Sequence, residues 1–115
     1  MEKLAKLKTV FKENGTVTAG NASGLNDGAA FVLMMTAEKA KELGYEPYAK
    51  WVCGADYGVE PRLMGIGPAF SNVKLLKKFG LSLSDIDVYE CNEAFAAQNL
   101  GAMREIERLT GEKID

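Results

Sequence analysis

An amide and a carboxylate follow a short apolar run in the second half of the chain. Residues 88–91 read Val-Tyr-Glu-Cys, and Asn92 and Glu93 come directly after them, before a helix-forming run that begins at Ala94. This order predicts a strand, a turn and a helix. Ligands of open α/β sheets bind at the carboxyl ends of strands, so Asn92 and Glu93 fall where an amide and a carboxylate could contact a substrate. The alternative is that Asn92 only caps the helix, because asparagine there accepts a hydrogen bond from an unpaired backbone N–H group.

Length and charge limit the class of protein. The chain has 115 residues, of which 47% are hydrophobic, and its net charge is -2. This is enough apolar material for one domain or part of one. The absence of a cationic block argues against nucleic-acid binding, which depends on neutralising phosphates. Four lysines make the first segment locally basic, either as a solvated helix face or as electrostatic help for a phosphate-bearing cofactor: Lys3, Lys6, Lys8 and Lys12.

The cysteine and histidine content excludes several kinds of site. Cys53 and Cys91 fit no metal-binding spacing, and the sequence contains no histidine. We therefore expect no metal site, and the chain by itself cannot hold a Ser-His or Cys-His pair. The sequence has no long apolar run that would predict insertion into a membrane. Two unpaired cysteines indicate reduced thiols and a cytoplasmic location.

Apolar and amphipathic runs alternate along the chain and predict a mainly parallel sheet covered by helices, which is the α/β class. Three predicted strands share apolar content: residues 29–35, 47–57 and 88–91. Three predicted helices share capping or amphipathic signals: Thr36 to Gly44, Pro68 to Gly80, and the run from Asn92 to Gly111. Because open strand edges invite association, we expect these strands to belong to a larger sheet.

The connecting segments carry weaker signals. We expect a short amphipathic helix over residues 1–11, a turn at Asn14-Gly15 and a helical turn over residues 25–28. Residues 59–68 read as a loop, and residues 81–87 as a turn or a single helical turn. Helical spacing predicts these apolar residues for the buried faces of the last two helices: Val73, Leu75, Leu76, Phe79, Ala94, Phe95, Ala97, Leu100, Ala102, Met103, Ile106 and Leu109.

Three long motifs in this order closely resemble the thiolases, and among them the acetyl-CoA acetyltransferases. The motifs are residues 15–30, 64–68 and 92–98. The resemblance implies a thiolase-like layered fold of two similar α/β halves. Residues 1–46 would be the end of the covering loop region with the last strand and helix of the N-terminal half. Residues 47–115 would be the first part of the C-terminal half, and the parent enzyme would be a homo-oligomer.

The resemblance also assigns site residues. Asn92 matches the asparagine that holds a water in an oxyanion hole of thiolases, and Glu93 would orient the turn. Seven further residues match positions that contact the coenzyme or line the thioester pocket. They are Ala19 and Ser23 at the pantetheine arm, Met64, Ala94 and Phe95 in the pocket, and Leu7 and Phe11 in the covering region. Cys53 and Cys91 match neither catalytic cysteine of the family. In the family pattern the nucleophilic cysteine precedes this stretch, and the catalytic histidine and second cysteine follow it.

These matches predict a segment of an acetyl-CoA C-acetyltransferase that acts through an acyl-cysteine intermediate. Coenzyme A thioesters would be substrates, with no covalently bound cofactor. The partners would be acyl-CoA molecules and the remaining thiolase segments or a complementary chain, with neither nucleic acid nor membrane. We expect the isolated chain to be inactive. The alternative is a non-catalytic coenzyme A-binding or assembly module derived from a thiolase.

Overall fold

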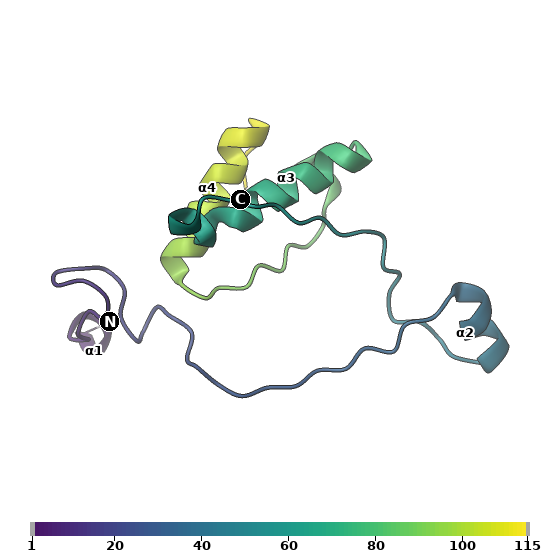
Figure 1. Cartoon of the computed structure of the whole chain (residues 1–115), viewed down its shortest axis with the longest axis horizontal. Helices are drawn as coiled ribbons and strands as arrows, with labels where there is room; N and C mark the ends of the chain where they lie inside the picture. The colour runs from purple at the N-terminus through teal and green to yellow at the C-terminus, as the bar shows by residue number, and fades with distance from the viewer. Residues whose placement is uncertain (1, 115) are drawn as a thin grey trace.

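Helices joined by long, unpaired connections form the computed structural model, which describes residues 2–114 (Figure 1). The elements in chain order are α1 (Glu2–Ala5), α2 (Ala37–Leu43), the 3-10 helix η1 (Pro61–Ile66), α3 (Gly67–Phe79), the 3-10 helix η2 (Leu83–Asp85) and α4 (Ala96–Thr110). Across residues 2–114 the only β pairing is two isolated antiparallel bridges, Thr9 with Thr18 and Ala22 with Phe95.

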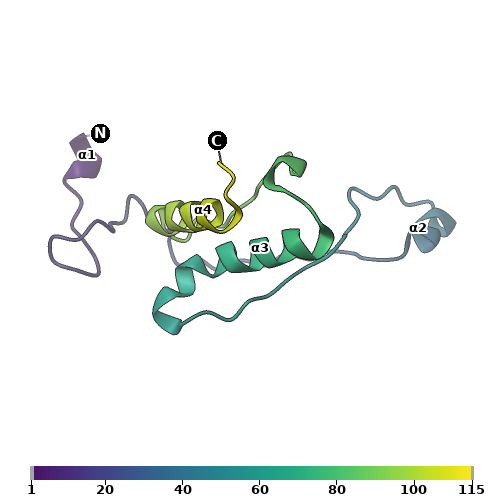
Figure 2. The same ribbon diagram turned by 90° about the horizontal axis from the view of Figure 1, so that it is seen from above.

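The core lies between α3 and α4, which pack against each other in both views (Figures 1 and 2). α3 buries residues at helical spacing, and Leu83 of η2 closes one end of the cluster. The buried cluster is Ala69, Val73, Leu76, Leu83 and Ile106. The predicted burial of Phe79, Ala97 and Leu100 is wrong. Phe79 and Leu100 are 42% and 56% exposed, and Ala97 is exposed as well. α4 turns Ala102 and Ile106 towards α3, which leaves Leu100 on the outer side.

The predicted helix ends are confirmed where local chemistry sets them. The Thr36 hydroxyl accepts a hydrogen bond from the Lys39 N–H at 3.2 Å and so caps α2. Gly44 and Gly80 end α2 and α3 in the left-handed conformation, with φ of 72° and 65°. Glycine adopts this conformation without the steric penalty of a side chain. Pro68 lies in the first turn of α3, where its missing N–H costs no helical hydrogen bond.

The three predicted strands are not formed within residues 2–114. Residues 29–35, 47–57 and 88–91 have no strand assignment, and the predicted burial of residues 29–35 is wrong, because Phe31 is 98% and Val32 83% exposed. A strand needs a neighbour for its backbone hydrogen bonds, and none of the described residues pairs with these segments. The layered sheet is therefore not formed by this chain alone.

Three further local predictions differ from the structure. The helical turn over residues 25–28 is absent, and the loop over residues 59–68 contains η1 instead. The first segment is helical only over Glu2–Ala5, so Lys6, Lys8 and Lys12 do not form a helix face. η2, in contrast, is the single helical turn predicted within residues 81–87.

The chain as a whole is open. Its radius of gyration is 18.5 Å, whereas a compact domain of this length would have about 13 Å. α2 stands apart from the α3–α4 pair in both views (Figures 1 and 2) and buries only Ala40. Residues 2–114 thus contain one small helical core and two long arms.

Candidate functional site at the start of α4

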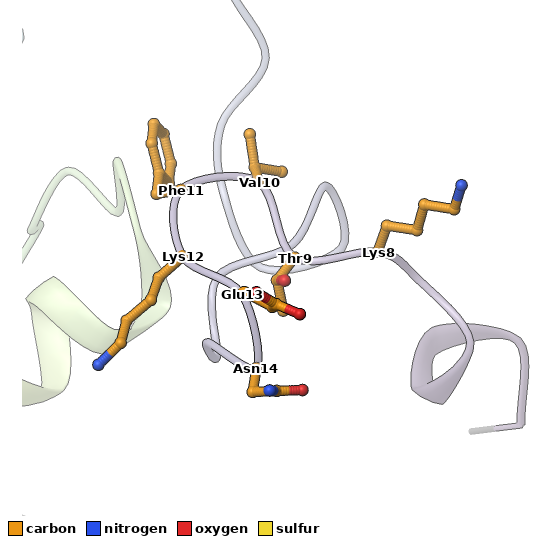
Figure 3. A pocket seen from close by; sticks show the side chains of 7 residues that line it. All are labelled: Lys8, Thr9, Val10, Phe11, Lys12, Glu13 and Asn14. Carbon is orange, nitrogen blue, oxygen red and sulfur yellow. The ribbon is translucent and has the colours of Figure 1, made fainter.

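A narrow loop over residues 8–18 carries Phe11, one of the residues predicted to contact the coenzyme. Gly15 N–H donates to the Lys12 carbonyl at 3.0 Å, and Val10 N–H donates to the Val17 carbonyl at 3.1 Å. Asn14 has a φ of 53°, a left-handed conformation that asparagine tolerates in turns. This confirms the predicted turn at Asn14-Gly15. An open hollow of about 500 Å³ lies along residues 8–14 (Figure 3).

Phe11 reaches from this loop to the start of α4. Its ring meets that of Phe95 edge to face, with centroids 5.9 Å apart and an interplanar angle of 77°, a favourable aromatic geometry. Figure 3 shows Phe11 on the side of the loop that faces α4, and Lys8 on the opposite side. Phe11 is nevertheless 72% exposed, so most of its surface is available to a ligand.

Leu7 lies against the glycine beside Ala19. A Cβ atom added to Gly20 would be 2.8 Å from Leu7 Cδ1, so the leucine side chain fills the space that glycine leaves. Asn21 closes the same region: its carbonyl side-chain oxygen accepts from Thr18 N–H at 2.8 Å, and its amide donates to the Thr16 carbonyl at 2.9 Å. Ala19 therefore lies in a turn closed by Asn21, and the Leu7 side chain packs against the neighbouring Gly20.

Residues 21–23 are clipped to residues 93–96, about 70 positions later in the chain. Ser23 N–H donates to the Ala94 carbonyl at 2.9 Å, and Ala96 N–H donates to the Asn21 carbonyl at 3.0 Å, on either side of the Ala22–Phe95 bridge. The Ser23 hydroxyl adds a hydrogen bond to the Glu93 carbonyl at 3.0 Å. We call these contacts the 21–23 clip. It brings Ser23, Ala94 and Phe95 together.

Asn92 does not cap α4. The helix begins at Ala96, the N-cap position belongs to Phe95, and no side chain caps it. Phe95 is extended, with φ of -139° and ψ of 136°, because the clip holds residues 93–96 in a strand-like path. Asn92 is exposed, and its side chain makes no hydrogen bond to any residue in 2–114. The capping interpretation of Asn92 is therefore wrong.

The residues around Asn92 are fixed by contacts of their own. Asn99 in the first turn of α4 donates from its amide to the Glu93 carboxylate at 3.4 Å. Upstream, the Tyr89 hydroxyl donates to the Leu83 carbonyl at 3.3 Å. Partial desolvation, followed by the nearby negative charge of Glu112, raises the pKa of Tyr89.

Met64 belongs to η1, which packs against the first turns of α4. A Cβ atom added to Gly65 would lie 3.1 Å from Gln98 Cγ, so η1 approaches the helix closely at this glycine. Met64 itself is 76% exposed. Two acceptor atoms of the same helical turn, Gln98 Oε1 and Asn99 Oδ1, are buried and have no partner within residues 2–114.

Sequence reasoning missed Asn21 and Asn99. Asn21 carries a recognisable signal, because asparagine in a glycine-bounded loop commonly bonds to nearby backbone groups. Asn99 lies inside a helical pattern and has no such signal. Among the described residues no cluster of three His, Cys, Asp or Glu side chains could hold a metal ion, and no helix in that range is long and apolar enough to span a membrane. Cys53 and Cys91 are free thiols.

Two family profiles cover almost the whole chain. Residues 1–38 match the thiolase N-terminal domain, and residues 45–115 match the thiolase C-terminal domain. A probable acetyl-CoA acyltransferase of Staphylococcus aureus is 53% identical over 115 residues. The match takes in 100% of this chain and 29% of that relative, so the chain spans less than a third of the relative's length.

Solved structures show the same likeness. The crystal structure of Bacillus anthracis acetyl-CoA acetyltransferase matches with a TM-score of 0.87 and 54% identity, over 92% of this chain and 27% of that one. Human mitochondrial 3-ketoacyl-CoA thiolase in complex with CoA matches with a TM-score of 0.77 and 42% identity, over 97% and 27% of the two chains. On the profile match to residues 45–115 and this structural agreement, the chain belongs to the thiolase family.

Proposed function

We propose that this chain is the part of an acetyl-CoA C-acetyltransferase that supplies coenzyme-binding surface and one element of an oxyanion hole. The observation that carries the proposal is the gathering of Phe11, Ser23, Ala94 and Phe95 beside Asn92, whose amide is exposed and makes no hydrogen bond within residues 2–114. An uncommitted amide next to a ligand surface is free to orient a water molecule towards a substrate oxygen.

The proposed reaction joins two acetyl-CoA molecules to acetoacetyl-CoA and releases CoA, or runs in reverse, through an acyl-cysteine intermediate. Negative charge develops on a thioester oxygen when the second acetyl group forms its enolate-like nucleophile. In the proposal the water held by Asn92 donates to this oxygen, and preorganised donors of this kind stabilise the transition state. Asn92 is neutral, so it does not compete for the proton.

Ser23 has a defined role in this proposal. Its hydroxyl has one proton, which it donates to the Glu93 carbonyl, so towards a ligand it can only accept a hydrogen bond. An amide N–H of the pantetheine arm is a suitable donor. Leu7, Ala19, Phe11 and Met64 then supply exposed apolar contacts for the same ligand.

Two lysines at the hollow extend the proposal to the charged end of the coenzyme. Lys8 and Lys12 both line the hollow of the 8–14 loop. Positive side chains at such a surface attract phosphate groups. This is the interpretation of the basic first segment that we favour, because Lys8 and Lys12 lie outside α1.

A chimera tests the proposal. Residues 1–115 would replace the corresponding segment of the B. anthracis acetyl-CoA acetyltransferase, which is 54% identical over the 92% of this chain that it matches. We expect the chimera to cleave acetoacetyl-CoA with CoA at a rate within about tenfold of its parent, a difference of about 1.4 kcal/mol in transition-state stabilisation. A folded chimera with no activity would refute the proposal.

The second candidate is a non-catalytic coenzyme A-binding or assembly module. It treats the lack of histidine in these 115 residues as a property of the module, whereas the enzyme-segment proposal places the histidine in another segment. It predicts that the isolated chain binds CoA tightly in titration calorimetry, whereas the enzyme-segment proposal expects weak binding because the surrounding segments are missing. A tight-binding chain together with an inactive chimera would select this candidate.

The proposal includes three statements about the parent enzyme. The junction between its two halves falls at residues 46 and 47, it forms a homo-oligomer, and it works in the cytoplasm. The last statement is supported by the free thiols of Cys53 and Cys91.

A further inference from the structure

The turn that carries Asn92 is held by its neighbours. Glu93, the next residue, is fixed at two points: its carbonyl accepts from the Ser23 hydroxyl at 3.0 Å, and its carboxylate accepts from the Asn99 amide at 3.4 Å. Asn92 makes no side-chain hydrogen bond within residues 2–114. The two hydrogen bonds of Glu93 therefore restrain the backbone from which the Asn92 side chain projects.

Ser23 makes the only side-chain contribution to the 21–23 clip. The other two hydrogen bonds of the clip join backbone groups, Ser23 N–H to the Ala94 carbonyl and Ala96 N–H to the Asn21 carbonyl. The hydroxyl extends this pairing by one residue, to the carbonyl of Glu93, the residue that follows Asn92. Without the hydroxyl the clip would stop at Ala94, and the Glu93 carbonyl would lose its partner from the first part of the chain.

We propose that Ser23 is a positioning residue for Asn92, which sets the Asn92–Glu93 turn through the hydrogen bond from its hydroxyl to the Glu93 carbonyl. The proposal rests on the proposed function, since it assigns Ser23 a task in the same reaction. The hydroxyl donates its proton in the positioning contact, and its oxygen can still accept a hydrogen bond from a ligand. Ser23 thereby joins coenzyme binding to the geometry of the oxyanion hole.

Kinetics of the active chimera separate positioning from binding. Ser23→Ala should lower kcat about tenfold, because small displacements of a catalytic group cost up to about a hundredfold. Ser23→Thr, which keeps a hydroxyl, should recover most of the loss. Adding Ser23→Ala to Asn92→Ala should lower kcat no further, because residues that act through one contact are not additive. Ser84→Ala, at an exposed serine of η2, is the control.

Two kinetic results would overturn the proposal. A raised KM with unchanged kcat would show that Ser23 only binds substrate. Independent, multiplicative effects of Ser23→Ala and Asn92→Ala on kcat would show that Ser23 does not act through Asn92. A chimera without any activity would refute the proposed function, and the positioning contact would then be judged by the following measurement.

Hydrogen exchange on the 115-residue chain tests the contact without activity. Ser23→Ala should speed exchange of the Ala96 N–H, which the clip protects, by about tenfold, the scale of one hydrogen bond. Amides within α3 should keep their rates. Equal exchange at Ala96 in the parent and the variant would overturn the proposal whatever the chimera does.

Discussion

At the scale of the residue, Asn92 has an unpaired side chain next to a residue that is held by two hydrogen bonds. Its amide is exposed and without a hydrogen-bond partner in residues 2–114, while Glu93 beside it is held by Ser23 and Asn99. Side chains that only stabilise a fold usually have their polar atoms paired, as Asn72 does through its bond to the Pro68 carbonyl at 2.8 Å. We therefore expect substitutions of Asn92 and Asn72 to have opposite effects on rate and stability.

Asn92→Ala in the chimera should lower kcat by about 100- to 1,000-fold, the scale for losing one oxyanion-hole donor. Its free energy of unfolding should change by less than about 0.5 kcal/mol, because Asn92 neither caps α4 nor makes a hydrogen bond in the described residues. Steady-state kinetics and thermal unfolding of one variant give both numbers. A variant that turns over at the parental rate would remove Asn92 from the mechanism.

Asn72→Ala is the matched control with the opposite expectation. Loss of the hydrogen bond to the Pro68 carbonyl should cost about 1 kcal/mol of stability and leave kcat unchanged, since Asn72 lies within α3. A fall in kcat for this variant would mean that asparagine substitutions affect the rate through general damage.

At the scale of the element, α3 and α4 form a helix pair in which one helix end is set locally and another by a distant contact. Gly80 ends α3 in the left-handed conformation, and Val73 and Leu76 are buried as their helical spacing predicts. The start of α4 is different, because the 21–23 clip keeps residues 93–95 extended and delays the helix to Ala96. Helix ends set locally and helix ends set by distant contacts should respond differently to substitution.

Gly80→Ala should destabilise the helix pair by about 1 to 2 kcal/mol, the cost of a side chain in the left-handed region. Gly80 has a φ of 65° with open space around it, so the penalty comes from the backbone alone. Gly58→Ala is the control, since it also has open space but no positive φ. Urea unfolding followed by circular dichroism should separate the two variants, and equal midpoints would contradict this account of the α3 end.

Leu76→Ala should destabilise the pair by about 2 to 5 kcal/mol, the range for removing a buried leucine side chain. Leu76 is 5% exposed in the core, whereas Leu100 on α4 is 56% exposed. Leu100→Ala should therefore change stability by less than about 0.5 kcal/mol. The helical circular dichroism signal and the unfolding midpoint should be measured for both variants. A loss of stability for Leu100→Ala as large as that for Leu76→Ala would contradict the exposed position of Leu100.

At the scale of the whole molecule, the chain combines a small core with long exposed apolar arms. Its extents are 59 × 36 × 28 Å, and Phe31, Trp51 and Val88 are each at least 70% exposed. The path of the chain nevertheless agrees with the solved acetyl-CoA acetyltransferase at a TM-score of 0.87. The arms thus contribute to a path shared with that structure, although they form no strands within residues 2–114.

The isolated chain should self-associate, because unpaired apolar segments seek partners. Sedimentation equilibrium should show a mass that rises with concentration. Phe31→Lys with Leu33→Lys should reduce this association, since both side chains are more than 75% exposed on one arm. A parent chain that stays monomeric and unfolds in one cooperative transition would show that it is a self-sufficient domain.

The isolated chain should also lack thiolase activity. It contains no histidine, and from the resemblance of its motifs to the thiolases we expect that neither Cys53 nor Cys91 is a catalytic cysteine. Without nucleophile and base, covalent catalysis has no first step. Purified chain should therefore leave acetoacetyl-CoA and CoA unchanged, and turnover that persists after removal of host enzymes would contradict this expectation.

The sequence by itself determined the features whose hydrogen bonds are local. The Thr36 cap, the glycine ends of α2 and α3, the turn at Asn14-Gly15 and the short η2 all depend on residues within five positions of one another. The motifs also identified the thiolase family, because they specify residue types in a long fixed order.

Only the tertiary structure decided that α4 begins at Ala96 and that Asn92 does not cap it. The clip that shifts the helix start joins Asn21 and Ser23 to residues about 70 positions away, a distance that no local pattern contains. The predicted strands depend on the same kind of information. A helix satisfies its backbone groups within four residues, whereas a strand exists only through a neighbouring chain segment, and residues 29–35, 47–57 and 88–91 have none within the part of the chain that the structure describes.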